Sequence, residues 1–198
     1  LEESAKIYLD NLRKQQPSIV SSIFADMVYV KGGHFTMGSD PQPTNDILDQ
    51  DGKTRGMVEQ NESPKHEVSL QDYYIGKFPI SQRLWTLIMG YNPSDTKDDT
   101  FPVAPVNWFE SQKFILRISY LTGIMFHMPT EAQWEYAARG GEKSKGTTFA
   151  GSNTFSEVGW SDHKHPIGTK KPNELGIYDM SGLVREWCGD LWGHYPDT

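Results

Sequence analysis

The first apolar residues of the chain recur at helical spacing. Four of them stand at positions i, i+3, i+4 and i+7: Ala5, Tyr8, Leu9 and Leu12. Their shared face predicts an amphipathic helix over residues 4–16, which Pro17 terminates because proline cannot continue a helix. The apolar positions that follow predict a second, shorter helical segment over residues 19–24.

Alternation then replaces the helical spacing. Met27–Val30 is rich in β-formers, residues 32–33 are a glycine pair suited to a turn, and residues 35–37 alternate apolar with polar side chains. This order predicts a hairpin between the two apolar segments. Two further strands are predicted at His66–Leu70 and at residues 73–75.

Two helices in the middle of the chain are predicted from residues that favour helix ends. Ser81 is suited to begin a helix that Gly90 ends, and Asn107 is suited to begin one that Gly123 ends. The second of these carries an apolar stripe that we assign to the core: Phe114, Ile118 and Leu121.

A third helix is predicted directly after Thr130. Thr130 and Gln133 have the spacing of a capping box, in which each side chain bonds the backbone N–H of the other residue. Glu131 in the first turn complements the helix dipole, and the glycines at 140–141 end the helix. These acidic and polar residues are therefore interpreted as structural.

Residues 39–63 form a long polar stretch with six acidic residues: Asp40, Asp46, Asp49, Asp51, Glu59 and Glu62. We interpret it as a solvated insertion. A second cation site is the alternative, but the sequence at 49–52 lacks the regularly alternating ligands of a calcium loop.

Composition favours a loop-rich fold. A chain of 198 residues is long enough for one domain with a sizeable core, although two are possible. Aromatic residues make up 12 % of it, beside 18 glycines and 12 prolines, so we expect large rings to pack irregular chain. The net charge of −7 argues against a nucleic-acid partner, and no apolar run is long enough to predict a transmembrane helix. The first residues do not resemble a signal peptide, and the start at Leu1 suggests processing or trimming.

Few residues suggest transition-metal or nucleophilic chemistry. His163 and His165 lie two apart, but a third ligand is not evident nearby, and His165 before Pro166 is better explained as part of a turn. Cys188 is the one cysteine, which excludes an internal disulfide and a CxxC site. Its only cationic neighbour in sequence is Arg185, so we interpret it as a packed small side chain rather than a nucleophile. No motif for acyl, phosphoryl or hydride transfer is present.

Residues 172–190 are the strongest candidate for a site-forming loop. Asp179 and Glu186 could supply hard carboxylate oxygens, and Gly182 would let the backbone turn so that carbonyls join them, which suits Ca²⁺. In the alternative interpretation the acids lie on the surface and the large side chains belong to the core: Tyr178, Met180 and Trp187. The residues alone favour that alternative.

Four segments together resemble the sulfatase-modifying factor, or formylglycine-generating enzyme, family: residues 27–39, 64–68, 128–141 and 172–182. The resemblance implies an α+β fold of the formylglycine-generating type, C-type-lectin-like and with much irregular structure. It covers residues 27–198 and leaves residues 1–26 as an N-terminal helical extension.

The family activity that this resemblance implies is the oxidation of a sulfatase cysteine to formylglycine by O₂, on copper held by a cysteine pair near the C-terminus. The chain ends at Thr198, before the segment that carries those cysteines in the family, so we expect an incomplete domain that is not catalytic as it stands. Copper is expected only if those cysteines exist.

The resemblance also implies structural Ca²⁺. By motif position Asp179 and Glu186 would give side-chain oxygens, and Gly182 and Val184 would give carbonyls. Asn153 resembles the leading ligand of a second calcium site. The family's usual Gly-Asn-Val-Trp-Glu-Trp run is changed here to Gly-Leu-Val-Arg-Glu-Trp at residues 182–187, but this removes no expected ligand.

Two functions remain open from the sequence. In the first, the chain belongs to an oxidase whose partner is a sulfatase-like cysteine peptide. In the second, it is a non-catalytic, calcium-stabilised, lectin-like binding module that recognises a protein or a glycan. An extracytoplasmic or cell-envelope location is favoured by the resemblance.

Overall fold

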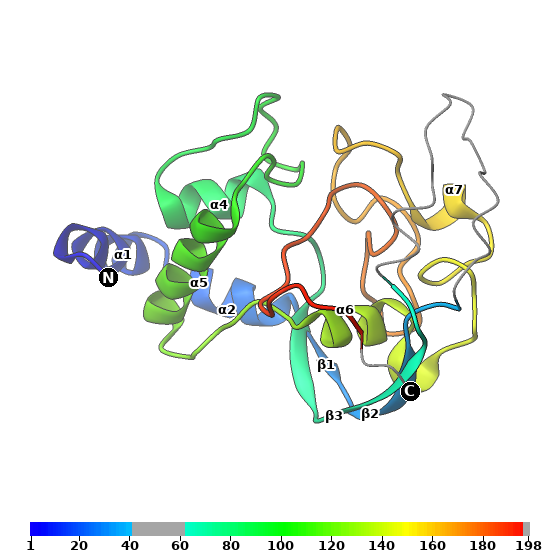
Figure 1. The fold of residues 1–198 in the computed structure, drawn as a ribbon. Coiled ribbons are helices and arrows are strands. Elements are labelled where there is room, and N and C mark those ends of the chain that lie inside the picture. The colour runs from blue at the N-terminus through cyan, green and yellow to red at the C-terminus, as the bar shows by residue number, and fades with distance from the viewer. Residues whose placement is uncertain (41–61, 196–198) are drawn as a thin grey trace.

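The computed structural model describes residues 1–40 and 62–195, so the candidate cation site at 49–52 lies outside the described residues. The elements follow in the order α1 (Glu3–Gln15), α2 (Ile19–Ala25), β1 (Met27–Val30), β2 (Gly33–Met37), β3 (His66–Leu70), β4 (Tyr73–Gly76), α4 (Gln82–Met89), α5 (Trp108–Thr122), α6 (Glu131–Ala138), η1 (Gly141–Lys143) and α7 (Phe155–Val158). Helices α1, α2, α4 and α5 lie toward one side, and the strands, α6, α7 and much irregular chain lie toward the other (Figure 1). The predicted α+β class with much irregular structure is confirmed.

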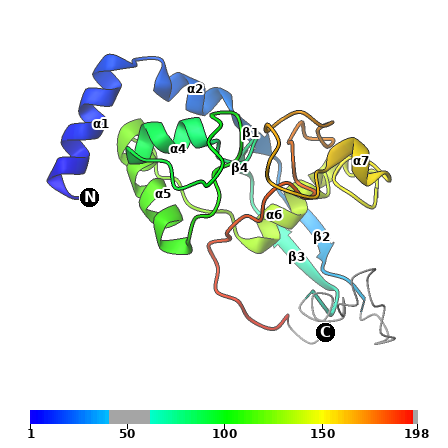
Figure 2. The same cartoon turned by 90° about the horizontal axis from the view of Figure 1, so that it is seen from above.

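The strands form one antiparallel ribbon in two halves. β1 pairs with β4, and β2 pairs with β3, so the predicted hairpin between β1 and β2 is wrong. Both halves keep the same register, and Figure 2 shows β2 and β3 leading away from β1 and β4. The glycine pair marks a break within the ribbon: a Cβ on Gly32 would lie 2.2 Å from the carbonyl oxygen of Leu70. Local glycines suggested a turn, whereas the pairing partners are distant in sequence.

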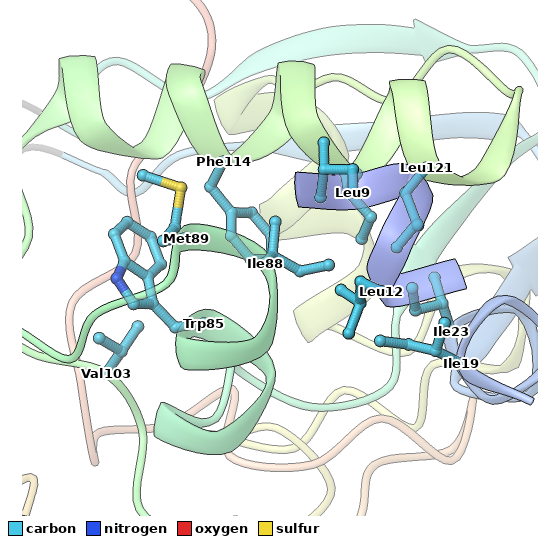
Figure 3. Close-up of a cluster of buried hydrophobic side chains, with 11 residues drawn as sticks. Leu9, Leu12, Ile19, Ile23, Trp85, Ile88, Met89, Val103, Phe114 and Leu121 are labelled. Atoms are coloured by element: carbon cyan, nitrogen blue, oxygen red, sulfur yellow. The ribbon is translucent and has the colours of Figure 1, made fainter. Parts of the chain in front are cut away.

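A helical core joins the N-terminal helices to α4 and α5. Its buried side chains come from all four helices, and Figure 3 shows Leu9, Leu12, Ile19 and Ile23 on the same side of α5 as Ile88 and Leu121. The rings of Trp85 and Phe114 stack with centroids 5.2 Å apart. The stripe of Phe114, Ile118 and Leu121 is buried, which confirms its assignment to the core.

Polar contacts also tie α1 to the helical core. The hydroxyl of Tyr8 donates to the carbonyl of Leu87, and the guanidinium of Arg13 donates to the carbonyls of Tyr120 and Leu121 at the end of α5. Residues 1–26, which the resemblance left outside the family domain, therefore share a core with residues that it includes.

The predicted caps are confirmed. Ser81 accepts a hydrogen bond from the amide of Leu84, and Asn107 and Thr130 each form a capping box. Gly90 and Gly123 end their helices in the left-handed conformation. None of the helices in the described ranges is both long and apolar enough to cross a lipid bilayer.

A second core surrounds α6. Tyr136 and Ala137 pack with Val30 of β1 and with Ile177 and Met180 of the irregular chain. The side-chain amide of the buried Asn173 donates to the carbonyl of Ala137 at 2.7 Å, so the loop after residue 172 is fixed to the end of α6. The candidate calcium loop is thus held against α6.

Candidate metal centre

Asp179 is a buried acid with only half of its hydrogen-bonding capacity used. The residue is 3 % exposed, and its Oδ2 accepts a 2.6 Å hydrogen bond from the amide of Gly168. Its Oδ1 is buried and has no hydrogen-bond partner among the described residues. Burial raises the pKa of Asp179, although the Gly168 hydrogen bond opposes the shift. The hypothesis that both acids lie on the surface is therefore wrong for Asp179.

The chain turns sharply after Asp179. Gly182 has φ +88°, and a Cβ there would lie 2.2 Å from the carbonyl oxygen of Trp160. Leu183, also with positive φ, donates its amide to that same oxygen at 2.7 Å. The amide of Val184 then bonds the carbonyl of Gly182 at 2.8 Å. A side chain at position 182 is incompatible with this close approach, which explains why glycine stands there.

Glu186 lies near Asp179 and against α6. Its Oε2 accepts a hydrogen bond from the indole N–H of Trp134 at 3.3 Å. Although the residue as a whole is exposed, desolvation of its carboxyl group raises the pKa of Glu186 to about 7, and the charge of Asp179 adds to the shift. In the folded chain the charge of Asp179 therefore acts on the carboxyl group of Glu186.

The segment at residues 160–170 supports the turn from outside. The ring of His165 stacks on Trp160 with centroids 3.7 Å apart, and Lys170 Nζ lies 3.7 Å from the Trp160 ring centroid. The amide of Ile167 donates to the carbonyl of Thr100. The predicted turn role of His165 is consistent with this stack. Within the described ranges, no three His, Cys, Asp or Glu side chains cluster closely enough to bind a metal ion.

The residues fit a hard divalent cation. A cation would coordinate Oδ1 of Asp179, which has no hydrogen-bond partner in the described residues, and would neutralise the negative charges of Asp179 and Glu186. The carbonyl of Gly182 already accepts one hydrogen bond but keeps a second lone pair. All four expected ligand atoms are oxygens, the donor type that Ca²⁺ prefers to softer atoms.

Asn153 stands apart from this group. Its Oδ1 accepts hydrogen bonds from the amide and the hydroxyl of Thr148, at 2.9 and 3.2 Å, and the residue is exposed. Within the described ranges no hydrogen bond connects it to Asp179 or Glu186.

The sequence did not reveal two contacts of the candidate site: the hydrogen bond from Trp134 to Glu186 and the one from Gly168 to Asp179. Both donors come from other segments of the chain, so no local sequence pattern indicates them.

Cys188 is a half-buried thiol in acidic surroundings. Burial raises the pKa of Cys188 to about 11, with further contributions from Asp190, Glu131 and Glu186. Its carbonyl accepts a hydrogen bond from the indole of Trp108 at 3.2 Å. These surroundings disfavour the thiolate form of the side chain.

Comparisons with known proteins identify what the chain is similar to. The model of the family "Sulfatase-modifying factor enzyme 1-like domain" matches residues 14–197. "Chaperone protein LppX" of Paenibacillus barcinonensis is 32 % identical over 186 residues, which cover 66 % of this chain and 66 % of that protein. "Formylglycine-generating enzyme" of Mus musculus is 29 % identical over 131 residues, which cover 58 % of this chain and 34 % of that protein.

A third relative and a solved structure complete the comparison. "Inactive C-alpha-formylglycine-generating enzyme 2" of Bos taurus is 28 % identical over 131 residues, which cover 58 % of this chain and 41 % of that protein. "Treponema denticola variable protein 1" superposes with a TM-score of 0.65 at 24 % identity, covering 86 % of this chain and 75 % of that chain, which shows the shared fold. The chain spans about two thirds of LppX and well under half of the other two relatives.

Proposed function

The chain belongs to the sulfatase-modifying factor enzyme 1-like domain family, and from that membership we propose that it is a calcium-stabilised protein-binding module rather than an oxidising centre. The observation that carries this proposal is the cysteine count. Cys188 is the one cysteine in the 198 residues. The family's implied chemistry needs a pair of thiolates on copper, because this soft metal selects soft ligands.

The environment of Cys188 supports the same conclusion. Burial and, after it, the neighbouring carboxylates disfavour a thiolate there, and the backbone carbonyl of Cys188 accepts a hydrogen bond from Trp108. The name of the bovine relative, an inactive formylglycine-generating enzyme, indicates that this fold also occurs in a protein without that activity. A binding role is therefore compatible with family membership.

In the proposed calcium site, Asp179 and Glu186 supply carboxylate oxygens, and Gly182 and Val184 supply carbonyls. Such a cation would link three segments: the loop after residue 179, α6 through the Trp134 hydrogen bond, and residues 160–168 through the Gly168 hydrogen bond. Its role would be to stabilise the loops, since Ca²⁺ has no redox chemistry here. Asn153 is retained as a proposed ligand of a second site, for which it would have to exchange its hydrogen bonds to Thr148.

We propose a polypeptide as the partner. The relative with 32 % identity is named a chaperone, which favours a protein ligand over a glycan. The alternative is that the chain forms part of an oxidase that acts on a cysteine peptide.

The two functions make opposite predictions in a direct assay. The chain is incubated with copper, O₂ and a peptide that carries a sulfatase-type cysteine motif, beside an active formylglycine-generating enzyme as the positive control. We expect mass spectrometry to find the peptide cysteine unchanged with this chain. Aldehyde formed in proportion to the chain added would overturn the non-catalytic proposal.

The binding role is tested with a displayed library of random peptides in the presence of Ca²⁺. We expect selection to enrich peptides that bind the folded chain and are released by unfolding it. If no sequence is enriched over an unrelated folded protein, the protein-binding role is wrong.

A further inference from the structure

A cavity of about 430 Å³ lies between β2 and the end of α6, separate from the candidate metal centre. Six of its lining residues matter here: His34 and Thr36 of β2, Tyr136 of α6, and Arg139, Glu142 and Ser144 beyond the end of α6. None of the proposed calcium ligands lines this cavity.

One edge of β2 lacks a neighbouring strand in the described ranges. β2 pairs with β3 alone, and two directly opposed pairs also touch through their side chains. His34 bonds Ser69 at 2.7 Å, and Thr36 bonds Glu67 at 2.5 Å. Side chains approach most closely at the pairs that do not exchange backbone hydrogen bonds. The backbone groups of His34 and Thr36 therefore point away from β3.

The contacts of Gly38, the residue after β2, show that this unpaired edge faces α6. The amide of Gly38 donates to Oε1 of Glu135 at 3.0 Å, and the carbonyl of Gly38 accepts from Arg139 at 3.0 Å. Alternate residues of a strand direct their backbone groups to the same edge. Those of Thr36 and His34 consequently face the α6 side, where both residues line the cavity, and outside the β2–β3 ladder no hydrogen bond reaches them in the described chain.

Tyr136 places an unused donor in the same cavity. The residue is only 3 % exposed, and its ring packs on Phe35 with centroids 5.1 Å apart. Its hydroxyl lies 2.8 Å from where a Cβ on Gly33 would stand, so glycine at position 33 makes room for it. Within the described ranges no hydrogen bond joins this hydroxyl to another group, and the residue lines the cavity.

Two more donors complete the wall. The guanidinium of Arg139, with its side chain 49 % exposed, uses one nitrogen for Gly38 and Glu135 and has other N–H groups left. The hydroxyl of Ser144 accepts a hydrogen bond from the amide of Gly146, and it donates to no acceptor in the part of the chain that the structure describes. The nearby carboxylate of Glu142 is paired with Lys31 at 3.1 Å. The cavity thus offers donors that match a carboxylate, next to backbone groups that match an extended chain.

We propose that the open edge of β2 binds an extended segment of a partner polypeptide as an added strand, with an Asp or Glu side chain of that segment in the cavity against Tyr136 and Arg139. This deepens the protein-binding function proposed above and rests on it. Backbone hydrogen bonds would supply affinity, and the acidic side chain would supply specificity.

The probe is a fluorescent seven-residue peptide of alternating Val and Thr with a central Glu, and a second peptide carries Gln in place of the Glu. We expect the Glu peptide to bind roughly tenfold more tightly, a difference of about 1.4 kcal/mol, because hydrogen bonds to a charged carboxylate are stronger than those to a neutral amide. Tyr136→Phe keeps the packed ring and should remove most of that preference. Tyr74→Phe, in the exposed Tyr74 of β4, is the matched control and should bind as the wild type does.

Hydrogen exchange then identifies the edge. On saturation with the Glu peptide, the amides of His34 and Thr36 should exchange markedly more slowly, whereas those of Phe35 and Met37 should change little because they already face β3. Glu-peptide binding without protection of His34 and Thr36, or with equal affinity for the Gln peptide, would overturn the proposal. If peptides selected from the library bind the Tyr136→Phe variant as tightly as the wild type, the proposed binding site is refuted but the protein-binding function is not. If the Glu peptide does not bind at all, the proposed site is wrong.

Discussion

The amide of Gly168 donates a 2.6 Å hydrogen bond to one oxygen of the Asp179 carboxylate, and the other oxygen is buried without a partner. This half-satisfied acid connects two loops, and its charge contributes to the raised pKa of Glu186. An unpaired buried carboxylate oxygen is costly, so a bound cation would stabilise the folded chain.

Calcium binding is expected to raise thermal stability. Calcium at a hundredfold excess over its Kd should stabilise the fold by about 2.7 kcal/mol, or roughly 5 to 10 °C in Tm for a domain of this size. Glu186→Gln should remove the calcium response because it removes a charged ligand oxygen. Calorimetry in EDTA and in Ca²⁺ measures both effects.

Glu3→Gln is the control for that experiment, because it neutralises an acid on α1 whose side chain is 77 % exposed. It should respond to Ca²⁺ as the wild type does. A wild-type Tm that is the same in EDTA and in Ca²⁺, or a Glu186→Gln variant that still responds, would contradict the proposed site.

Gly182→Ala should be far more damaging than Gly176→Ala. Both glycines have positive φ, so each substitution carries a backbone cost of about 1 kcal/mol. Only at Gly182 would the new Cβ meet the carbonyl of Trp160, whereas nothing lies within 4 Å of one at Gly176. We expect a loss of about 3 kcal/mol and a weakened calcium response for Gly182→Ala, measured by urea unfolding. Equal losses for the two variants would show that the turn is not closely packed.

The N-terminal helix should unfold together with the rest of the chain. Leu9 is fully buried among α4 and α5 side chains, so Leu9→Ala should cost about 2–5 kcal/mol. Ile7 on the same helix is 56 % exposed, and Ile7→Ala should change stability by about 0.5 kcal/mol or less. We expect a single unfolding transition, whose midpoint is lowered by Leu9→Ala and not by Ile7→Ala. If α1 of the wild-type chain unfolds in a separate, earlier transition, the helix is an independent extension.

Acid should abolish the contribution of Asp72. The hydroxyl of Tyr29 and the amide of Gly32 hold the pKa of Asp72 below its ordinary value of 3.8. A carboxyl whose pKa is lower in the folded than in the unfolded chain stabilises the fold above the unfolded value, and this is lost as the pH falls through the folded value. Asp72→Asn should therefore lower stability at about pH 6 and have a smaller effect at a pH well below 3.8, where the Asp72 carboxylate becomes protonated in the folded chain too.

Urea unfolding at the two pH values measures this difference, and Tyr29→Phe, which removes the larger cause of the shift, should reproduce part of it. A destabilisation by Asp72→Asn that is as large in acid as at neutral pH would mean that the charge of Asp72 is not the source of its effect.

Helix ends and buried helix faces followed from the sequence because their causes are local. The capping boxes at Asn107 and Thr130 need only residues three apart, and the stripe from Phe114 to Leu121 lies on one face whatever it packs against. The family resemblance singled out Asp179 and Glu186 as calcium ligands, although the residues alone favoured a role outside any site, and their ligand role stays a prediction.

The tertiary structure decided what depends on distant partners. The alternation in β1 and β2 predicted strands but not that they would pair with β4 and β3, because register depends on which strand lies alongside. Burial of Asp179, its bond to Gly168 and the contact of Glu186 with Trp134 arise from packing of separate segments. The open edge of β2 beside Tyr136 likewise exists only once α6 is docked on the ribbon. The sequence alone therefore determined the elements and named the acids, and long-range packing decided their environment.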